Sequence, residues 1–202
     1  MRYVIAAIAM LSCMTIVATG QARKRSSVGT PCRMSADQLP EIRGLRLGMS
    51  VADVLAVFPE PSSRSAIQKA VDDAKKPESY GFAIASLFRS EPQGNPNFAG
   101  LESIQLELLD ERVSSFTVRY DRQTPWDAVD QFAARLAHAF HLPAPEHWKT
   151  EYGVRVLTCN GFTIFVFLNN GNGITVENAT AEQVVRDRRK AAKEKVREAF
   201  KP

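Results

Sequence analysis

The sequence predicts an α+β domain built from two units, each a helical segment followed by an antiparallel meander of strands, in the order ααβββ-αβββ. Apolar residues repeat at helical spacing in some stretches and alternate with polar residues in others, so both kinds of element are expected. The strand candidates come in groups of three, which favours an antiparallel sheet with the helices on one face. Two capped helix starts, at Ser50 and Thr124, open the two units, and a basic helix is expected at the C-terminus.

Residues 1–22 have the pattern of a secretory signal peptide. A positive start is followed by residues 3–20, which carry no charge, and small residues offer cleavage sites after Gly20 and Ala22. The alternative is an uncleaved membrane anchor over residues 3–20, since this length reaches the lower end of a bilayer span and three cationic residues follow it. We expect a periplasmic or secreted protein, or a membrane-anchored one if the segment is retained.

Residues 23–40 predict a flexible tether, because they are polar, contain glycine and prolines, and show no periodicity. Two of the three cysteines, Cys32 and Cys159, remain after cleavage of the signal peptide. An even pair in an oxidising compartment suggests a disulfide, which would fasten the tether to the second half of the domain. The alternative of a buried Cys159 and a free Cys32 stays open, since an unpaired cysteine also packs as a small hydrophobic residue.

The folded domain is expected over residues 41–180, with possible halves at 41–122 and 123–180. Its first helix has a clear start, because Ser50 is an N-cap residue and Asp53 stands in the capping-box position. The remaining elements of the first half follow from helical spacing, aromatic content and period-two alternation. They are a helix over 63–75, a strand over 80–88, and a hairpin with strands at 104–108 and 116–120 around Asp110-Glu111.

The second half repeats this order. Thr124 is expected to cap a helix that has Pro125 in its first turn and an apolar face running to about residue 140. Three strands are then expected over 152–159, 162–168 and 174–178. The first two are joined by Asn160-Gly161, which is the strongest short hairpin signal.

The C-terminal segment, residues 181–202, contains eight Lys and Arg against four Asp and Glu, a net charge of +4 that equals the charge of the whole chain. The body of the domain is therefore close to neutral, and no basic face argues for nucleic acid as a partner. The segment is expected to be a solvated helix. Membrane contact is expected only through this tail or the N-terminal segment.

The stretch GLRLGMSVADVLAVFP, residues 44–59, resembles the opening of the SmpA/OmlA family of small outer-membrane lipoproteins and, more broadly, the fold of β-lactamase inhibitory protein. The residues that carry the resemblance are Gly48, Met49, Ser50, Val54 and Pro59. It implies a fold used for protein contacts in the envelope, without chemistry. This chain departs from the family in lacking a convincing lipobox and in having a second unit and a basic tail.

Two groups of polar residues are candidates for a metal-binding or catalytic site. Three histidines lie within ten residues, although prolines interrupt the segment: His138, His141 and His147. Four carboxylates lie near the first hairpin, in an alternation that indicates a solvated sheet face: Glu102, Glu107, Asp110 and Glu111. We assign no catalytic, cofactor-binding or metal-binding residue, and only Cys32 and Cys159 are expected to pair.

The expected function is therefore that of a non-enzymatic exported envelope protein that binds another envelope protein through its sheet face or loops. Two alternatives remain. One is a periplasmic small-molecule or lipid binder with a cavity between helices and sheet. The other is a hydrolase whose site is assembled from separated residues.

Overall fold

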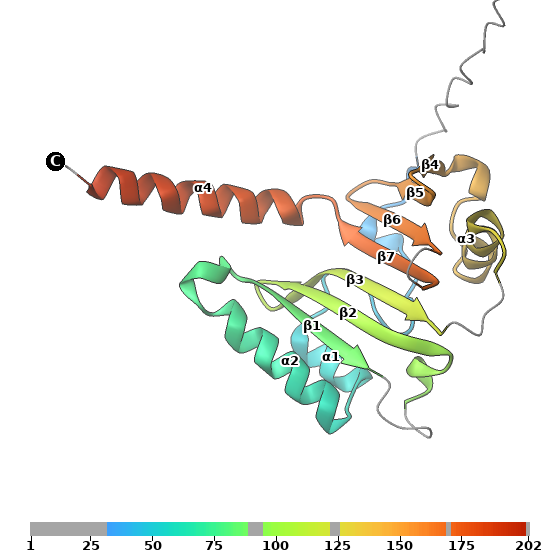
Figure 1. Ribbon diagram of the computed structural model, residues 1–202, viewed down its shortest axis with the longest axis horizontal. Helices are drawn as coiled ribbons and strands as arrows, with labels where there is room; N and C mark the ends of the chain where they lie inside the picture. The colour runs from blue at the N-terminus through green and yellow to red at the C-terminus, as the bar shows by residue number, and fades with distance from the viewer. Residues whose placement is uncertain (1–31, 89–94, 122–125, 169–170, 201–202) are drawn as a thin grey trace, which may run out of the picture.

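The computed structural model of the 202-residue chain describes residues 32–88, 95–121, 126–168 and 171–200. The predicted signal peptide or anchor and the first part of the predicted tether lie outside the described residues. The predicted α+β class is confirmed, because helices pack against an antiparallel sheet (Figure 1).

The described residues form a seven-stranded sheet whose strands follow the order β1-β2-β3-β7-β6-β5-β4. The main elements in chain order are α1 (Val51–Val57), α2 (Pro61–Ala74), β1 (Phe82–Phe88), β2 (Leu101–Leu109), β3 (Arg112–Tyr120), α3 (Val129–Ala139), β4 (Lys149–Glu151), β5 (Val154–Thr158), β6 (Phe162–Phe167), β7 (Gly173–Asn178) and α4 (Ala181–Ala199). Every neighbouring pair of strands is antiparallel. The second unit has four strands where three were expected, since the short β4 pairs with β5 at the edge.

The two units share one sheet. β7 lies between β3 and β6, so the last strand of the second unit pairs directly with the last strand of the first. The two possible halves are therefore continuous through backbone hydrogen bonds along β3 and β7.

α1 starts as the sequence predicts. The backbone N–H of Asp53 donates to the Ser50 hydroxyl at 3.3 Å, and the Ser50 N–H donates to the Asp53 carboxylate at 3.2 Å. This reciprocal capping box satisfies N–H groups that the first turn of a helix leaves without partners. α2 follows at once, with Pro61 in its first turn and with Ile67 and Val71 buried toward the sheet.

The predicted start of α3 is wrong. The helix begins at Val129, and its N-cap is Ala128, which has no side-chain acceptor. Thr124 and Pro125 lie outside the described residues. Trp126 precedes the helix and packs against Phe132 with ring centroids 5.6 Å apart, so this apolar contact is made without helical geometry at residue 126.

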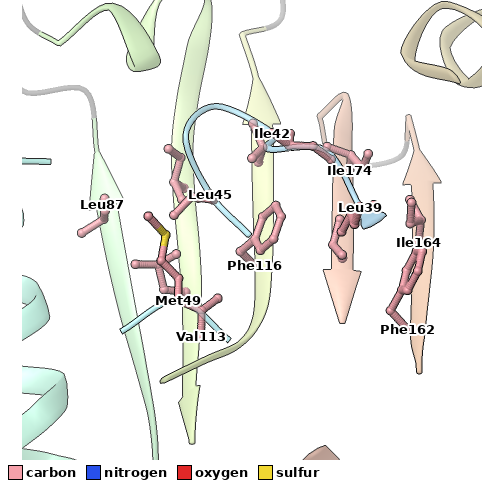
Figure 2. Packing of buried hydrophobic residues seen from close by; sticks show 14 of the residues in the cluster. Leu39, Ile42, Leu45, Met49, Leu87, Val113, Phe116, Phe162, Ile164 and Ile174 are labelled. Atoms are coloured by element: carbon pink, nitrogen blue, oxygen red, sulfur yellow. The ribbon is translucent and has the colours of Figure 1, made fainter. Parts of the chain in front are cut away.

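Residues 32–49, which we call the strap, cross the sheet on the same face as α1, α2 and α3. Figure 2 shows Leu39 over the β6–β7 side of the sheet and Met49 over the β1–β2 side, with Ile42 and Leu45 between them. All four side chains are buried. Residues 32–40, which were expected to belong to a flexible tether, are attached to the domain through the disulfide of Cys32 and the buried side chain of Leu39. Irregular backbone of this kind gives no periodic signal in the sequence.

Both predicted hairpins are present. β5 and β6 are joined through Asn160 and Gly161, and Gly161 has the positive φ of 85° that favours glycine. β2 and β3 are joined through Asp110 and Glu111, whose φ angles are 52° and 60°. Two consecutive left-handed residues give the turn that fits the twist of a two-residue hairpin.

Candidate functional site on the open face of the sheet

The two faces of the sheet differ sharply. Strand alternation and register place the buried apolar side chains of the inner strands on the face that the strap and α1 to α3 cover. We call the opposite side the open face. It is formed by Phe82, Ile84, Ser86 and Phe88 of β1, Ser103, Gln105 and Glu107 of β2, Ser115, Thr117 and Arg119 of β3, Gly173, Thr175 and Glu177 of β7, Thr163, Phe165 and Phe167 of β6, and Val154 and Val156 of β5.

The β1 side of the open face carries exposed apolar side chains. Ile84 is 51% exposed and Phe88 is 63% exposed, and both lie on an edge strand. Large apolar side chains on a sheet edge are unusual for a surface that meets only water, because such an edge also offers unpaired backbone groups. β1 therefore has the features of a strand that meets a partner.

Toward the other edge, one aromatic ring packs across the open face. Gly173 of β7 has no side chain, and a Cβ atom at this position would come within 2.4 Å of the Phe167 ring. The ring therefore lies across β7, and the Arg119 guanidinium of β3 sits 5.5 Å from its centroid. In the next outward-facing row of β3 and β7, the hydroxyls of Thr117 and Thr175 are hydrogen-bonded at 2.8 Å.

α4 covers one end of the open face. Val185 is the buried residue of this helix, and the C-terminal part of the helix extends away from the domain (Figure 1). Thr180 is the N-cap, although its hydroxyl bonds to the Asn178 side chain and not to the helix. The exposed C-terminal part agrees with the expectation of a solvated helix, and Val196 and Phe200 are exposed on it.

Two arginines attach α4 to the sheet. Arg188 donates to both carboxylate oxygens of Asp110, at 2.8 and 2.7 Å, and to the Tyr80 carbonyl at 2.9 Å. Arg189 lies over the Tyr80 ring, 5.7 Å from its centroid. The ion pair lowers the pKa of Asp110, chiefly through the hydrogen bonds from Arg188. Gly81 lies beneath it, since a Cβ atom there would come within 2.5 Å of the Asp110 carboxylate.

A cavity of about 400 Å³ lies between the first turns of α4 and the open face. Glu107, Ser115 and Glu177 from three adjacent strands lie in one row of the register and line it. Burial raises the pKa of Glu107, and the charge of Glu182 raises it further. Burial likewise raises the pKa of Glu177, with contributions from Glu107 and Glu182. Three carboxyl groups thus share one partly enclosed space.

The structure pairs Cys32 with Cys159, the two cysteines that parity suggested. Their Cα atoms lie 4.6 Å apart across a sequence separation of 127 residues, and their sulfurs are bonded. Beside the bond, Ser35 and Asn160 form an isolated bridge, with the Asn160 N–H donating to the Met34 carbonyl. The disulfide therefore fixes the start of the strap to the turn between β5 and β6.

The candidate histidines and carboxylates do not form one site in the described residues. His138 and His141 are exposed and His147 is partly buried, and within the described ranges no group of three or more His, Cys, Asp and Glu could hold a metal ion. Of the four carboxylates near the first hairpin, only Glu107 faces the cavity, while Asp110 pairs with Arg188. The sequence does not indicate Ser115 and Glu177 as site residues, because only the pairing of β2, β3 and β7 places them beside Glu107.

Comparison with known proteins finds no family model, curated protein or solved structure that matches this chain. In the part of the chain that the structure describes, no helix is both long and apolar enough to cross a membrane. The open face, the cavity under α4 and the disulfide are therefore the features from which a function is argued.

Proposed function

We propose that the protein is a non-enzymatic, exported envelope protein that binds another envelope protein through the β1 side of its open face. The observation that carries this proposal is the exposure of Ile84 and Phe88 on an edge strand, on a face where the inner strands carry mostly polar side chains. An edge strand can accept an additional strand through its backbone, while alternate side chains give specificity.

The location rests on two further observations. Residues 1–22 have the pattern of a signal peptide, and the disulfide between Cys32 and Cys159 suits an oxidising compartment outside the cytoplasm. The resemblance of residues 44–59 to small envelope lipoproteins points to the same setting. We infer a periplasmic or secreted protein whose partner is also in the envelope.

Site-specific photo-crosslinking tests the binding surface. A photoreactive amino acid at position 84 or 88 should form an adduct with one envelope protein, whereas the same amino acid at the exposed position 65, on α2, should not. The adduct formed from position 88 should disappear when Ile84 is replaced by Asp and persist when Ser65 is replaced by Asp. Equal adducts from all three positions, or an adduct unaffected by Ile84→Asp, would contradict the proposal.

The intact mass of protein recovered from the envelope tests the location. A mature chain that begins after Gly20 or Ala22 is expected. A mass that retains residues 1–20 would favour the membrane-anchored alternative, and recovery of the protein with free Cys32 and Cys159 from the cytoplasm would contradict export.

A further inference from the structure

The floor of the cavity under α4 is formed by β1, β2, β3 and β7, and α4 covers it. Ser115 of β3 pairs with Glu107 of β2 on one side and with Glu177 of β7 on the other. All three side chains line the cavity, and the first turns of α4 close it from above. Adjacent strands lie about 4.8 Å apart, so the two glutamates flank the serine at equal spacing.

The chain balances the negative charge of the cavity only in part, because three glutamates and two arginines line it. Neither Glu107 nor Glu177 forms an ion pair or a side-chain hydrogen bond with another described residue, although both are partly buried. Two arginines of α4 also line the cavity, but neither forms an ion pair with Glu107 or Glu177 among the described residues. Arg186 pairs with Glu182 and bonds to Gln183, and Arg189 lies over the Tyr80 ring.

The middle of the floor holds a serine whose hydroxyl faces the cavity. Ser115 is 5% exposed, and its side chain has no hydrogen-bond partner among the described residues. Its oxygen is not among the fully buried side-chain atoms without a partner in the described residues, so a molecule in the cavity can reach it. Because Ser115 lies between two carboxylates that can only accept when ionised, a group that offers several N–H donors would satisfy all three side chains.

We propose that this cavity binds one ammonium or guanidinium group, which donates hydrogen bonds to Glu107, Ser115 and Glu177. A volume of about 400 Å³ is at the lower end of the range for small-molecule sites, which suits a single cationic head group with a short apolar stem. The Phe82 and Val185 side chains in the lining would contact that stem. This inference does not rest on the proposed partner surface, although the two adjoin, because Ile84 of β1 pairs with Glu107 in the register.

The head group could belong to a free small amine or to a basic side chain of a protein, and its chemistry is the same in both. Agmatine, which carries both a guanidinium and an ammonium group, and an acetylated, amidated Gly-Arg-Gly peptide represent these two sources. Isothermal titration calorimetry of the full chain at neutral pH and low salt should show saturable binding of at least one probe, with one molecule per chain.

Three variants decide whether the carboxylates and the hydroxyl form the site. Glu107→Gln and Glu177→Gln should each weaken binding about tenfold or more, since each removes a charged acceptor, and Ser115→Ala should weaken it several-fold. Glu102→Gln is the matched control, because it removes an exposed carboxylate of β2 that does not line the cavity, and it should leave binding unchanged. Circular dichroism melting should show that all four variants are folded.

The relative affinity of the two probes shows whether the site takes a free amine or a basic side chain, and the absence of binding shows that the proposal is wrong. Tighter binding of agmatine than of the peptide assigns the site to a free amine, and equal or tighter binding of the peptide assigns it to a basic side chain. Binding should also weaken in acid, since Glu107 and Glu177 lose their charge as pH falls through their raised pKa values. No saturable binding of either probe, or an equal loss in Glu102→Gln, would overturn the proposal.

Discussion

Arg188 and Asp110, which are 78 residues apart in the sequence, form a two-pronged ion pair between α4 and the turn of the first hairpin. The nitrogen-to-oxygen distances are 2.8 and 2.7 Å, and the same arginine also binds the Tyr80 carbonyl. Both side chains are partly solvated, so the pair contributes modestly to stability. Its main effect is to fix the position of α4 over the cavity.

Replacing Arg188 with Ala should therefore loosen α4 more than it destabilises the domain. The free energy of unfolding should fall by no more than about 1 kcal/mol. Amide hydrogen exchange in α4 should become faster, while exchange in α2 should not change. Arg186→Ala is the control, since Arg186 bonds only within α4 in the contacts described here. Faster exchange in α2 would show that the variant acts on the whole domain.

The ion pair also has a pH dependence. Because the folded-state pKa of Asp110 is lowered, its contribution is present above the unfolded pKa, near 4, and is lost as pH falls through the lower folded value. The difference in α4 exchange between the wild type and Arg188→Ala should therefore shrink in acid.

The Ser50 cap should be measurable in stability. Ser50→Ala removes the acceptor of the Asp53 N–H and should lower the free energy of unfolding by about 0.5–2 kcal/mol. Urea denaturation measures this loss. Ser65→Ala, at an exposed position within α2, is the control and should change stability little. An unchanged midpoint for Ser50→Ala would mean that Asp53 or water replaces the cap.

The disulfide should contribute strongly, because it joins positions 127 residues apart. Closing a loop of this size restricts the unfolded chain by about 4–5 kcal/mol in the chain-entropy description. A double variant, Cys32→Ser with Cys159→Ser, should therefore unfold at a much lower urea concentration than the oxidised wild type. Wild type treated with reductant is the matched control and should resemble the double variant. A loss below about 1 kcal/mol would show that the unfolded chain is already compact.

The position of the Phe167 ring on the open face depends on Gly173. Gly173→Ala places a methyl group against the Phe167 ring, and the resulting crowding should cost about 1–3 kcal/mol of stability. The ring should also leave its position near Arg119, which changes near-ultraviolet circular dichroism. Adding Phe167→Leu to Gly173→Ala should recover part of the loss. A double variant less stable than both single variants would contradict this account.

Local signals in the sequence predict much of this fold. The capping box at Ser50, the Asn160-Gly161 turn and the alternation around Asp110-Glu111 each involve residues that interact within a few positions, and all are present. Thr124 failed as a start signal for α3, because the segment at Trp126 packs its aromatic ring without being helical. Local preference there was overridden by tertiary packing.

The strap and the cavity could not be predicted in this way. Leu39 and Ile42 are buried by contacts with distant strands, so neither period two nor helical spacing marks them. Glu107, Ser115 and Glu177 come together only through the order of strands, which places β7 beside β3. The disulfide could be suggested from the sequence, because it needed only an even number of cysteines in the mature chain and an oxidising compartment.

β7 is the last strand of the sheet to be synthesised, yet it occupies the central position between β3 and β6. While the chain is still growing, the first three strands and the later ones are two separate pieces, each with an open strand edge that invites pairing with other chains. Cys159 precedes β7 in the chain, so after export the disulfide with Cys32 can join these pieces before the sheet closes. Completion of the fold then becomes an insertion step, in which one late strand enters a gap between two preformed edges. A chaperone that shields strand edges during this interval would prevent the two open edges from pairing with other chains.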